Sequence, residues 1–430
     1  MALSLLSLAW GVRDGLRLNA AELEARRLHR LRRLLDHSYE NVSYYRKLFD
    51  SVGFRPGHLK RVSDLSAIPI TTRQKLQMTP SAELIARGEQ LARLERYQTS
   101  GSTGSPVHIY RARREKWFRL LLTLRAFVHN GLRWDDRVVT ISRLPSTLVR
   151  RSAFYRGPFI RLWNISFYED AEKQLELLLK VRPTVLYGYA PSLAVLGNLI
   201  AKQGRGPMPL RLAATSAEIL MPGYRAAIQK GFGVDPLDVY NCAELGDIGR
   251  QCSRRAGFHV NVDWLQVEIL QSGNLVSPGE SGEVVVTNLY RYAMPLIRYS
   301  PGDFASPAKG PCSCGLGLPL LDGLDGRAQT VVPLPGNRSF IGFSRIMSDF
   351  PEIARFQIVQ RALDHFVVNL IPGAGFSRDA LGRIASALGS KLGAGIRVEA
   401  RVAEASELVE GPGKFRSVIP VGPVDFNQTV

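Results

Sequence analysis

The chain has 430 residues, of which 45% are hydrophobic and 22% charged, so it can bury a full core and is not expected to be disordered. Its 56 Lys and Arg against 38 Asp and Glu give a formal net charge of +18, which would suit a nucleic acid or a membrane surface if the basic residues were clustered. They are scattered along the sequence, so we expect neither partner.

The densest basic run, residues 24–33, overlaps leucines at helical spacing, which places its arginines on the solvated face of an amphipathic helix. Residues 1–12 are apolar, but they lack a preceding basic residue and are too short to span a bilayer. Four cysteines in so long a chain do not form the disulfide framework of a secreted protein. We therefore expect a cytoplasmic location.

Helical spacing of apolar residues predicts helices over residues 20–50, and residues 63–77 indicate a turn followed by another helix start. From residue 96 onward, strand-like runs at residues 138–142 and 184–187 alternate with helical stretches. The helical stretches are residues 117–129 and 171–181. This alternation predicts an α/β domain.

Residues 265–299 change to β-branched alternation with Gly, Asn and Pro turns, as expected for antiparallel hairpins. Beyond residue 327, a strand at 328–332, a helix at 377–392 and a strand at 395–402 predict a separate α+β unit. We therefore expect a large N-terminal domain over residues 1–326, with a helical front end and a β-hairpin subdomain. A small mobile C-terminal domain over residues 327–430 would follow a hinge at residues 325–327.

The segment from Thr99 to Pro106 (TSGSTGSP) combines small residues and hydroxyls between two apparent strands. Gly101 and Gly104 allow the backbone to turn N–H groups toward an anion, and the neighbouring hydroxyls add donors, which suits phosphate binding. No Gly-Lys-Ser/Thr follows, so this is not a Walker A loop. An ordinary Ser/Gly/Thr turn is the alternative.

Three further segments carry residues that are suited to nucleotide chemistry. Tyr240 and Glu244 follow an apolar run, where the tyrosine could stack on a base and the carboxylate could bind Mg²⁺. Asp303 follows Pro301-Gly302 and could accept two hydrogen bonds from a ribose, although Pro-Gly-Asp alone is a common turn. Lys414 lies in a Gly/Pro-rich loop, where it is either a mobile charge for catalysis or a solvated lysine.

In this order, the motifs resemble the adenylate-forming superfamily of acyl-CoA synthetases. Residues 99–106 are similar to its phosphate-binding loop, residues 240–244 to its Tyr-Gly-x-Thr-Glu motif and residues 298–303 to its Tyr-Arg-Thr-Gly-Asp region. Gly326-Arg327 resembles its hinge. The front end, at residues 41–46 and 68–72, is similar to the phenylacetate-CoA ligase branch.

The resemblance implies a role for each matching residue. Lys414, Glu244 and Thr103 would be catalytic, with Glu244 binding Mg²⁺ and Lys414 bridging the carboxylate and the α-phosphate. The residues implied to bind ATP are Thr99, Ser100, Gly101, Ser102, Gly104, Ala217, Glu218, Tyr240, Asp303 and Arg327. Those implied to line the acyl group are Tyr187, Gly188, Tyr189 and Pro191.

The sequence also departs from the family pattern. Ala243 stands where a Thr or Ser hydroxyl is usual, Asn241 stands for Gly, Ser300-Pro301 replaces Arg-Thr, and Gln329 falls where the hinge usually carries Asp. These departures are compatible with the nucleotide site, but they bear on CoA-ligase efficiency and on the usual domain rotation, so a catalytically reduced or repurposed member stays open.

Cys252, His259, Cys312 and Cys314 form two clusters that together offer three thiols and an imidazole. This is the ligand set of a closed tetrahedral Zn²⁺ site, which would staple the hairpin region without doing chemistry. Free cysteines and an ordinary histidine are the alternative. Cys242 lies within the Glu244 motif and is left out of the metal site.

We therefore predict attack of a carboxylic acid, aryl or acyl, on the α-phosphate of Mg-ATP, followed by transfer of the acyl group to CoA. An amine acceptor, or AMP transfer to a small molecule without CoA, is the first alternative. A basic nucleic-acid-binding protein with a zinc staple is a remote one, since it leaves the Thr99 to Pro106 loop unexplained. The sequence does not decide the oligomeric state, and a homodimer is one option.

Overall fold

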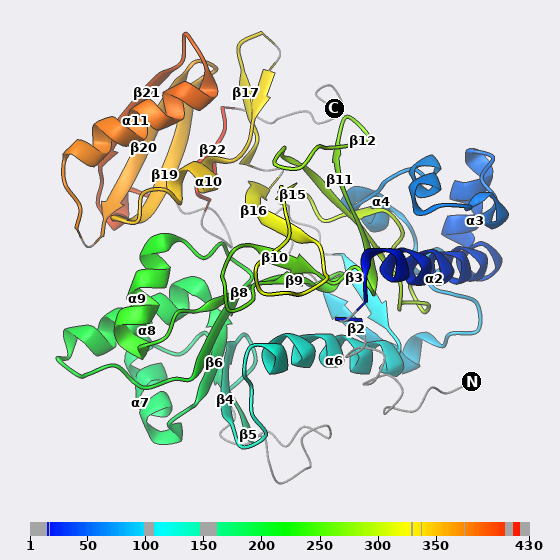
Figure 1. Ribbon diagram of the computed structural model, residues 1–430, viewed down its shortest axis with the longest axis horizontal. Helices are drawn as coiled ribbons and strands as arrows, with labels where there is room; N and C mark the ends of the chain where they lie inside the picture. The colour runs from blue at the N-terminus through cyan, green and yellow to red at the C-terminus, as the bar shows by residue number, and fades with distance from the viewer. Residues whose placement is uncertain are drawn as a thin grey trace.

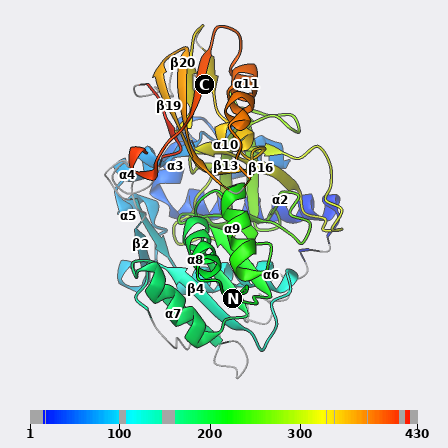
Figure 2. The ribbon, with the colours of Figure 1, turned by 90° about the vertical axis from the view of Figure 1, so that its left-hand side faces the viewer.

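The computed structural model describes residues 15–16, 18–98, 107–146, 161–327, 330–336, 338–373, 375–408 and 416–421. Two sheets organise these residues: a 14-stranded sheet through the body of the molecule and a 4-stranded sheet near the C-terminus (Figure 1). Seen from the side, the smaller sheet and its helix stand above the larger part (Figure 2). The α/β class with a smaller C-terminal unit is thus confirmed.

The front end is helical, as predicted for residues 20–50. Helix α2 (Ala20–Asn41) begins with a capping box in which Asn19 Oδ1 accepts from Glu22 N at 3.0 Å. The extended residue Val42 separates it from α3 (Ser43–Ser51). Short elements follow: η1 (Pro56–His58), η2 (Val62–Ala67), β1 (Thr71–Thr72), α4 (Arg73–Met78), α5 (Ser81–Leu84) and η3 (Leu91–Arg93).

Tyr45 ties this front end to the hairpin region. Its side chain is fully buried, and its hydroxyl donates to Pro295 O at 3.2 Å and accepts from Ile297 N at 2.9 Å. Leu31, Leu34 and other apolar residues of α2 and α3 share one core with Ile297. The helices therefore pack on the large sheet as part of one body.

The central part of the large sheet is parallel. Strands β4 (Arg137–Ser142), β5 (Arg161–Ser166), β6 (Val185–Tyr189), β7 (Leu212–Ser216) and β8 (Leu237–Cys242) lie in the order β8-β7-β6-β4-β5. Helix α6 (Arg113–His129) precedes β4, and the helices that connect the later strands are α7 (Ala171–Val181), α8 (Ala190–Lys202) and α9 (Pro222–Phe232). Figure 1 shows α7, α8 and α9 together beside these strands. Helices α8 and α9 approach closely at Gly197 and Gly231, where a Cβ on Gly231 would lie 2.3 Å from Gly197 Cα.

The predicted hairpins continue this sheet in antiparallel fashion. The strands are β9 (Gly246–Arg250), β10 (Phe258–Val260), β11 (Leu265–Gln271), β12 (Asn274–Leu275), β13 (Gly282–Asn288), β14 (Tyr299–Ser300), β15 (Asp303–Pro307) and β16 (Leu320–Arg327). Strand β1 of the front end pairs in parallel with β14, so that Thr71 lies opposite Tyr299. A separate hairpin joins β2 (Glu95–Gln98) to β3 (His108–Arg111).

The C-terminal unit has its own sheet and core. Its sheet has the order β21-β20-β19-β22, formed by β19 (Ile353–Ala362), β20 (His365–Pro372), β21 (Arg397–Val402) and β22 (Val418–Ile419). Helix α11 (Asp379–Leu392), the short helix α10 (Phe343–Met347) and the hairpin of β17 (Val332–Leu334) and β18 (Arg338–Phe340) accompany it. Phe343, Phe366 and Ile384 are central to its apolar core.

The strand expected at residues 328–332 is shifted in the structure, because β17 begins only at Val332. Residues 328–329 lie outside the described part of the chain, and Thr330 Oγ1 donates to Arg327 O at 2.7 Å and accepts from Arg327 N at 3.1 Å. Among the residues that the structure describes, no helix combines the length and apolarity needed to cross a bilayer.

Replacing Tyr45 by Phe should lower the free energy of unfolding by about 1–3 kcal/mol, because the buried Ile297 N–H and Pro295 carbonyl would lose a hydrogen-bond partner. Urea denaturation measures the change. Tyr39→Phe is the matched control, since its hydroxyl makes an exposed hydrogen bond to Asp50, and it should change stability by less than about 0.5 kcal/mol. Equal effects of the two substitutions would contradict this role of Tyr45.

Candidate active site

A cavity of about 210 Å³ lies where the carboxyl ends of β7 and β8 face the C-terminal unit. It brings together the predicted nucleotide residues Ala217, Glu218, Tyr240, Asp303 and Arg327. The C-terminal unit contributes residues of β19 and of the segment around β22 to the same walls, namely Arg355, Phe356, Arg416, Ser417 and Val418. The carboxyl ends of parallel strands are the usual ligand position in α/β sheets.

Tyr240, Asp303 and Arg327 form one polar group at this cavity. Tyr240 OH donates to Asp303 Oδ2 at 3.0 Å, and Arg327 Nε lies 3.2 Å from Asp303 Oδ1. Burial raises the pKa of Tyr240 and of Asp303, and the Asp303 carboxylate raises the pKa of Arg327. Asp303 and the last residue of β16 are therefore coupled, as the order of the motifs anticipated.

Ala217 and Glu218 form the turn that follows β7. Ala217 has a φ of +69°, which is uncommon for a residue other than glycine. The turn carries both residues to the cavity wall beside Tyr240. A left-handed alanine at a ligand cavity is the kind of local strain that functional sites retain.

Asp238 also lines the cavity, although the sequence interpretation did not single it out. Its side chain is 7% exposed and accepts hydrogen bonds from Thr215 Oγ1 at 3.0 Å and from Val239 N at 3.1 Å. Burial raises its pKa to about 6. Within the sequence it is one polar residue in an apolar strand, and only the fold reveals that it faces a cavity.

Glu244 lies in the turn between β8 and β9, and its side chain is 8% exposed. Its Oε1 atom lies 2.9 Å from Arg73 Nη1 at the start of α4, and Tyr299 OH of β14 donates to the same oxygen at 3.4 Å. The pairing of β1 with β14 brings these two partners to one place. Among the described residues, Arg73 and Tyr299 thus both contact Oε1 of this carboxylate.

The backbone of this turn is held by side chains from distant parts of the chain. The buried guanidinium groups of Arg111 and Arg291 donate to the carbonyls of Ala243 and Glu244, respectively. Asn288 Nδ2 donates to Leu245 O at 3.1 Å. The position of Glu244 is thus fixed from β3 and from the segment after β13, and the sequence gives no local signal for these contacts.

The residues expected beside the acyl group have different surroundings. Tyr187 OH donates to Ser216 Oγ at 2.8 Å and accepts from Asn241 Nδ2 at 3.1 Å, and burial raises its pKa to about 12. Since Asn241 lines the cavity, Tyr187 lies next to it. Gly188 is packed instead, because a Cβ there would lie 2.7 Å from Leu193 Cδ1. Tyr189 ends β6, and Pro191 lies in the first turn of α8.

Several predicted residues lie outside the part of the chain that the structure describes. They are Thr99, Ser100, Gly101, Ser102, Thr103, Gly104, Gln329 and Lys414. The strands on both sides of the glycine-rich loop, β2 and β3, are described and pair with each other, with Gln98 opposite His108. The roles of the eight residues outside the described part remain predictions.

The four predicted metal ligands meet in space. Their ligand atoms all lie within 4.8 Å of one another, with Cys252 Sγ 3.6 Å from Cys312 Sγ and Cys314 Sγ 3.3 Å from His259 Nε2. Tetrahedral Zn²⁺ places such atoms about 3.5–3.8 Å apart. His259 Nδ1 donates to Leu318 O at 3.3 Å, which leaves Nε2 as the ligand atom. The three thiols, the imidazole and the hydrogen bond that orients this imidazole therefore fit a Zn²⁺ site.

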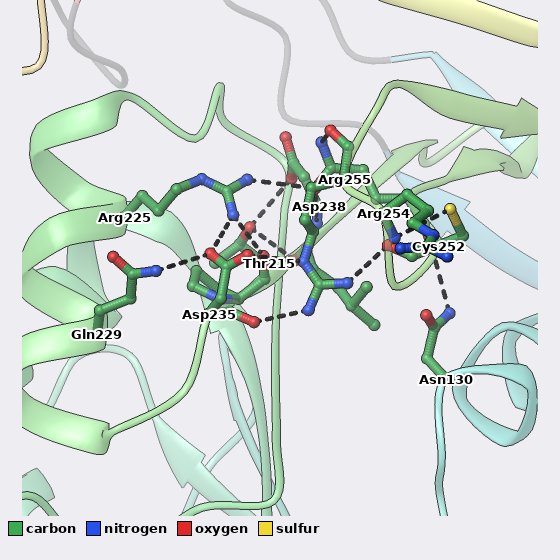
Figure 3. Close-up of polar contacts among 12 residues, drawn as sticks. Asn130, Thr215, Arg225, Gln229, Asp235, Asp238, Cys252, Arg254 and Arg255 are labelled. Carbon is green, nitrogen blue, oxygen red and sulfur yellow. Dashed lines mark hydrogen bonds and ion pairs between the residues drawn. The ribbon is translucent and has the colours of Figure 1, made fainter. Parts of the chain in front are cut away.

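A polar network joins this cluster to the cavity. Arg225 of α9 and Arg255 of the cysteine loop both pair with Asp235, and Arg255 Nη1 also donates to Cys252 O at 2.6 Å (Figure 3). On the other side, Asp238 N donates to the Gln251 side chain at 3.0 Å. The metal-ligand loop and the cavity residue Asp238 are thus linked through neighbouring contacts.

No protein-family model matches the chain. The phenylacetate-coenzyme A ligase of Aromatoleum evansii is 27% identical over 291 residues, which cover 66% of each protein. That of Thermus thermophilus is 26% identical over 368 residues, or 79% of this chain and 78% of the relative. The crystal structure of 2-hydroxyisobutyryl-CoA ligase in the postadenylation state superposes with a TM-score of 0.78 at 18% identity, over 97% of this chain and 92% of that protein.

The chain is thus similar in sequence to phenylacetate-CoA ligases and has the fold of the adenylate-forming CoA ligases. The resemblance predicted from the motifs is confirmed.

The raised pKa of Asp238 predicts a pH-dependent effect of Asp238→Asn. Since the folded protein holds the proton up to a pH of about 6 while the unfolded chain releases it near 3.8, ionisation of Asp238 opposes folding as the pH rises between these values. The Asn variant lacks this penalty, so its free energy of unfolding should rise relative to the parent by on the order of 3 kcal/mol between pH 4 and pH 7. Denaturant titrations at both pH values measure it. A difference that does not vary with pH would contradict the assignment.

Proposed function

We propose that the chain activates a carboxylic acid with ATP to form an acyl-adenylate and pyrophosphate, and then transfers the acyl group to CoA. The observation that carries this proposal is the cavity that gathers Ala217, Tyr240 and Asp303, together with the buried carboxylate of Glu244 in the turn that follows β8. The similarity to phenylacetate-CoA ligases supports the same conclusion.

In this proposal the nucleoside occupies the cavity between the large sheet and the C-terminal unit. Asp303 accepts from the ribose hydroxyls while Arg327 and Tyr240 keep its carboxylate oriented. Adenine lies against Tyr240 and the turn of Ala217 and Glu218. The acid lies next to Asn241 and Tyr187, so that its carboxylate can approach the α-phosphate in line.

Glu244 fits a Mg²⁺ ion that arrives with the triphosphate. Mg²⁺ is usually bound by one or two carboxylates together with phosphate oxygens and waters, and Glu244 offers a carboxylate whose Oε1 atom contacts Arg73 and Tyr299. Mg²⁺ bound there would neutralise charge on the phosphates as the acid attacks. Catalysis by the chain itself would then consist of positioning and electrostatic stabilisation.

Two predicted elements complete the reaction. The hydroxyls and amides of Thr99 to Gly104 would hold the β- and γ-phosphates, and Lys414 would bridge the attacking carboxylate and the α-phosphate. Transfer to CoA would follow a rotation of the small domain about residues 325–327. Just after this position Thr330 bonds back to Arg327, and β17 begins only at Val332, which supports a break between the two units.

ATP–pyrophosphate exchange against a panel of aryl, acyl and amino acids tests the first half-reaction. Acid-dependent exchange is expected for at least one of them, and mass spectrometry of the products with and without CoA then identifies the acceptor. A thioester that forms only with CoA supports the proposal. Detection of an amide, or of an AMP adduct formed without CoA, would show that the acceptor in the second half-reaction is not CoA.

We also propose that Cys252, His259, Cys312 and Cys314 hold one structural Zn²⁺ ion. Four protein ligands leave no open position for water, so the ion would staple the loop after β9 to the segment before β16. The polar network through Arg255 and Gln251 supports an indirect contribution to the nucleotide cavity.

If Glu244 binds Mg²⁺, substitutions at Glu244 and at the neighbouring Ala243 should change the rate of pyrophosphate exchange in opposite directions. Glu244→Gln keeps the shape of the side chain but removes its charge, so pyrophosphate exchange should fall at least about 100-fold. Ala243→Thr restores a hydroxyl beside the proposed metal site and should retain or raise the exchange rate at low Mg²⁺. A Mg²⁺ titration of both variants measures these effects. If Glu244→Gln equals the parent at every Mg²⁺ concentration, the assignment of the nucleotide site is wrong.

Protein purified without added metal should contain about one equivalent of zinc per chain. Cys314→Ser should lower the zinc content and the melting temperature, because it removes one of four ligands. Cys242→Ser is the control, since Cys242 lies in the Glu244 motif outside the cluster, and it should retain the metal. Elemental analysis gives the answer directly. Absence of metal, or a disulfide between Cys312 and Cys314, would refute the site.

A further inference from the structure

The ion pair between Arg73 and Glu244 occupies one side of the carboxylate that the proposed function assigns to Mg²⁺. Arg73 Nη1 lies 2.9 Å from Glu244 Oε1, and the two side chains are 29% and 8% exposed, respectively. Neither the motifs nor their resemblance pointed to Arg73. The contact joins residues 171 positions apart in the sequence, so only the fold reveals it.

The strand pairing that precedes Arg73 fixes its position. Thr71 N donates to Arg298 O at 2.8 Å, and Thr71 and Thr72 lie opposite Tyr299 and Ser300. Arg73 is the next residue and begins α4. Since Tyr299 OH donates to the same carboxylate oxygen as Arg73, the short β1–β14 pair delivers both groups to Glu244.

We propose that Arg73 is the counter-ion of Glu244 in the metal-free protein, so that a divalent cation enters this site together with the nucleotide and not before it. The inference rests on the proposed function for the assignment of Mg²⁺ to Glu244. It adds a positioning residue and an order of binding to that assignment.

Electrostatics gives the reason. A buried carboxylate needs a compensating charge, and Arg73 supplies it when no ligand is bound. A free divalent cation would have to approach the carboxylate beside a guanidinium group that already neutralises it, and the two positive charges repel each other. A triphosphate brings several negative charges, which both cations can share, and a guanidinium group is well suited to phosphate oxygens.

Ala243 strengthens the need for such a partner. The residue next to Glu244 offers no hydroxyl that could help to orient the carboxylate or the metal. Within the part of the chain that the structure describes, Arg73 and Tyr299 contact the carboxylate. Loss of Arg73 should therefore release Glu244 to bind a cation alone.

The probe is Mn²⁺, which prefers oxygen ligands as Mg²⁺ does. Electron paramagnetic resonance measures the concentrations of free and bound Mn²⁺. Titrations of the full chain are made with and without a non-hydrolysable ATP analogue. The variants are Arg73→Gln, Arg73→Lys, Glu244→Gln and the double variant Arg73→Gln/Glu244→Gln. Arg61→Gln is the matched control, because it removes an exposed arginine of the same front end that pairs with Asp64 at 3.6 Å.

Without nucleotide, Arg73→Gln should bind Mn²⁺ at least tenfold more tightly than the parent, and the double variant should lose this gain. Arg73→Lys, which keeps the charge, and Arg61→Gln should both resemble the parent. With the ATP analogue present, Arg73→Gln should need a higher analogue concentration for half-saturation, since one phosphate partner is gone. Melting curves check that each variant is folded.

An unchanged or weaker Mn²⁺ affinity in Arg73→Gln would overturn the inference, as would an Arg73→Lys variant that binds free Mn²⁺ as tightly as Arg73→Gln. Failure of the proposed function has a different signature. In that case Glu244→Gln would leave Mn²⁺ binding unchanged even with the nucleotide analogue, which shows that the metal is held elsewhere.

Discussion

A carboxylate that is almost excluded from solvent must be matched by positive charge and hydrogen bonds, and much of this structure serves that need for Glu244. Its side chain meets Arg73 and Tyr299, while the carbonyls of its own turn accept from Arg111 and Arg291. Because these partners come from the front end, from β3 and from the hairpin region, those three parts must fold together before the carboxylate is in place.

Because of this dependence, the helical front end contributes to the geometry of the candidate site. Tyr45 binds the backbone around Ile297 just before β14, and β1 pairs with β14 itself. The same segment then continues through Asp303 to the cavity, where Asp303 meets Arg327 at the end of β16. Stability of the front end and geometry of the candidate nucleotide site are therefore linked through one short stretch of chain. The cysteine cluster contributes on the opposite side, through Arg255 and Gln251 to Asp238.

The sequence predicted what is encoded locally. Periodicity located α7 at its observed ends and the hairpins near residue 265, and two residues that the motifs singled out, Tyr240 and Asp303, do line one cavity, because each lies in a short recognisable pattern. It missed Arg73 and Asp238, whose importance depends on contacts far along the chain or on which face of a strand borders a cavity. Of the strand expected at residues 328–332, the described residues Thr330 and Val331 lie before β17, and the Thr330 side chain bonds back to Arg327, a contact that periodicity does not register.

The central claim is that Glu244 binds the metal of a nucleotide seated between the two units. Anomalous diffraction from crystals grown with Mn²⁺ and a non-hydrolysable ATP analogue tests it most directly. We expect a manganese peak about 2 Å from a Glu244 carboxylate oxygen, with the nucleoside in the cavity lined by Ala217, Tyr240 and Asp303. A manganese peak that is bound to phosphate but has no contact with Glu244, or a nucleoside outside this cavity, would contradict it.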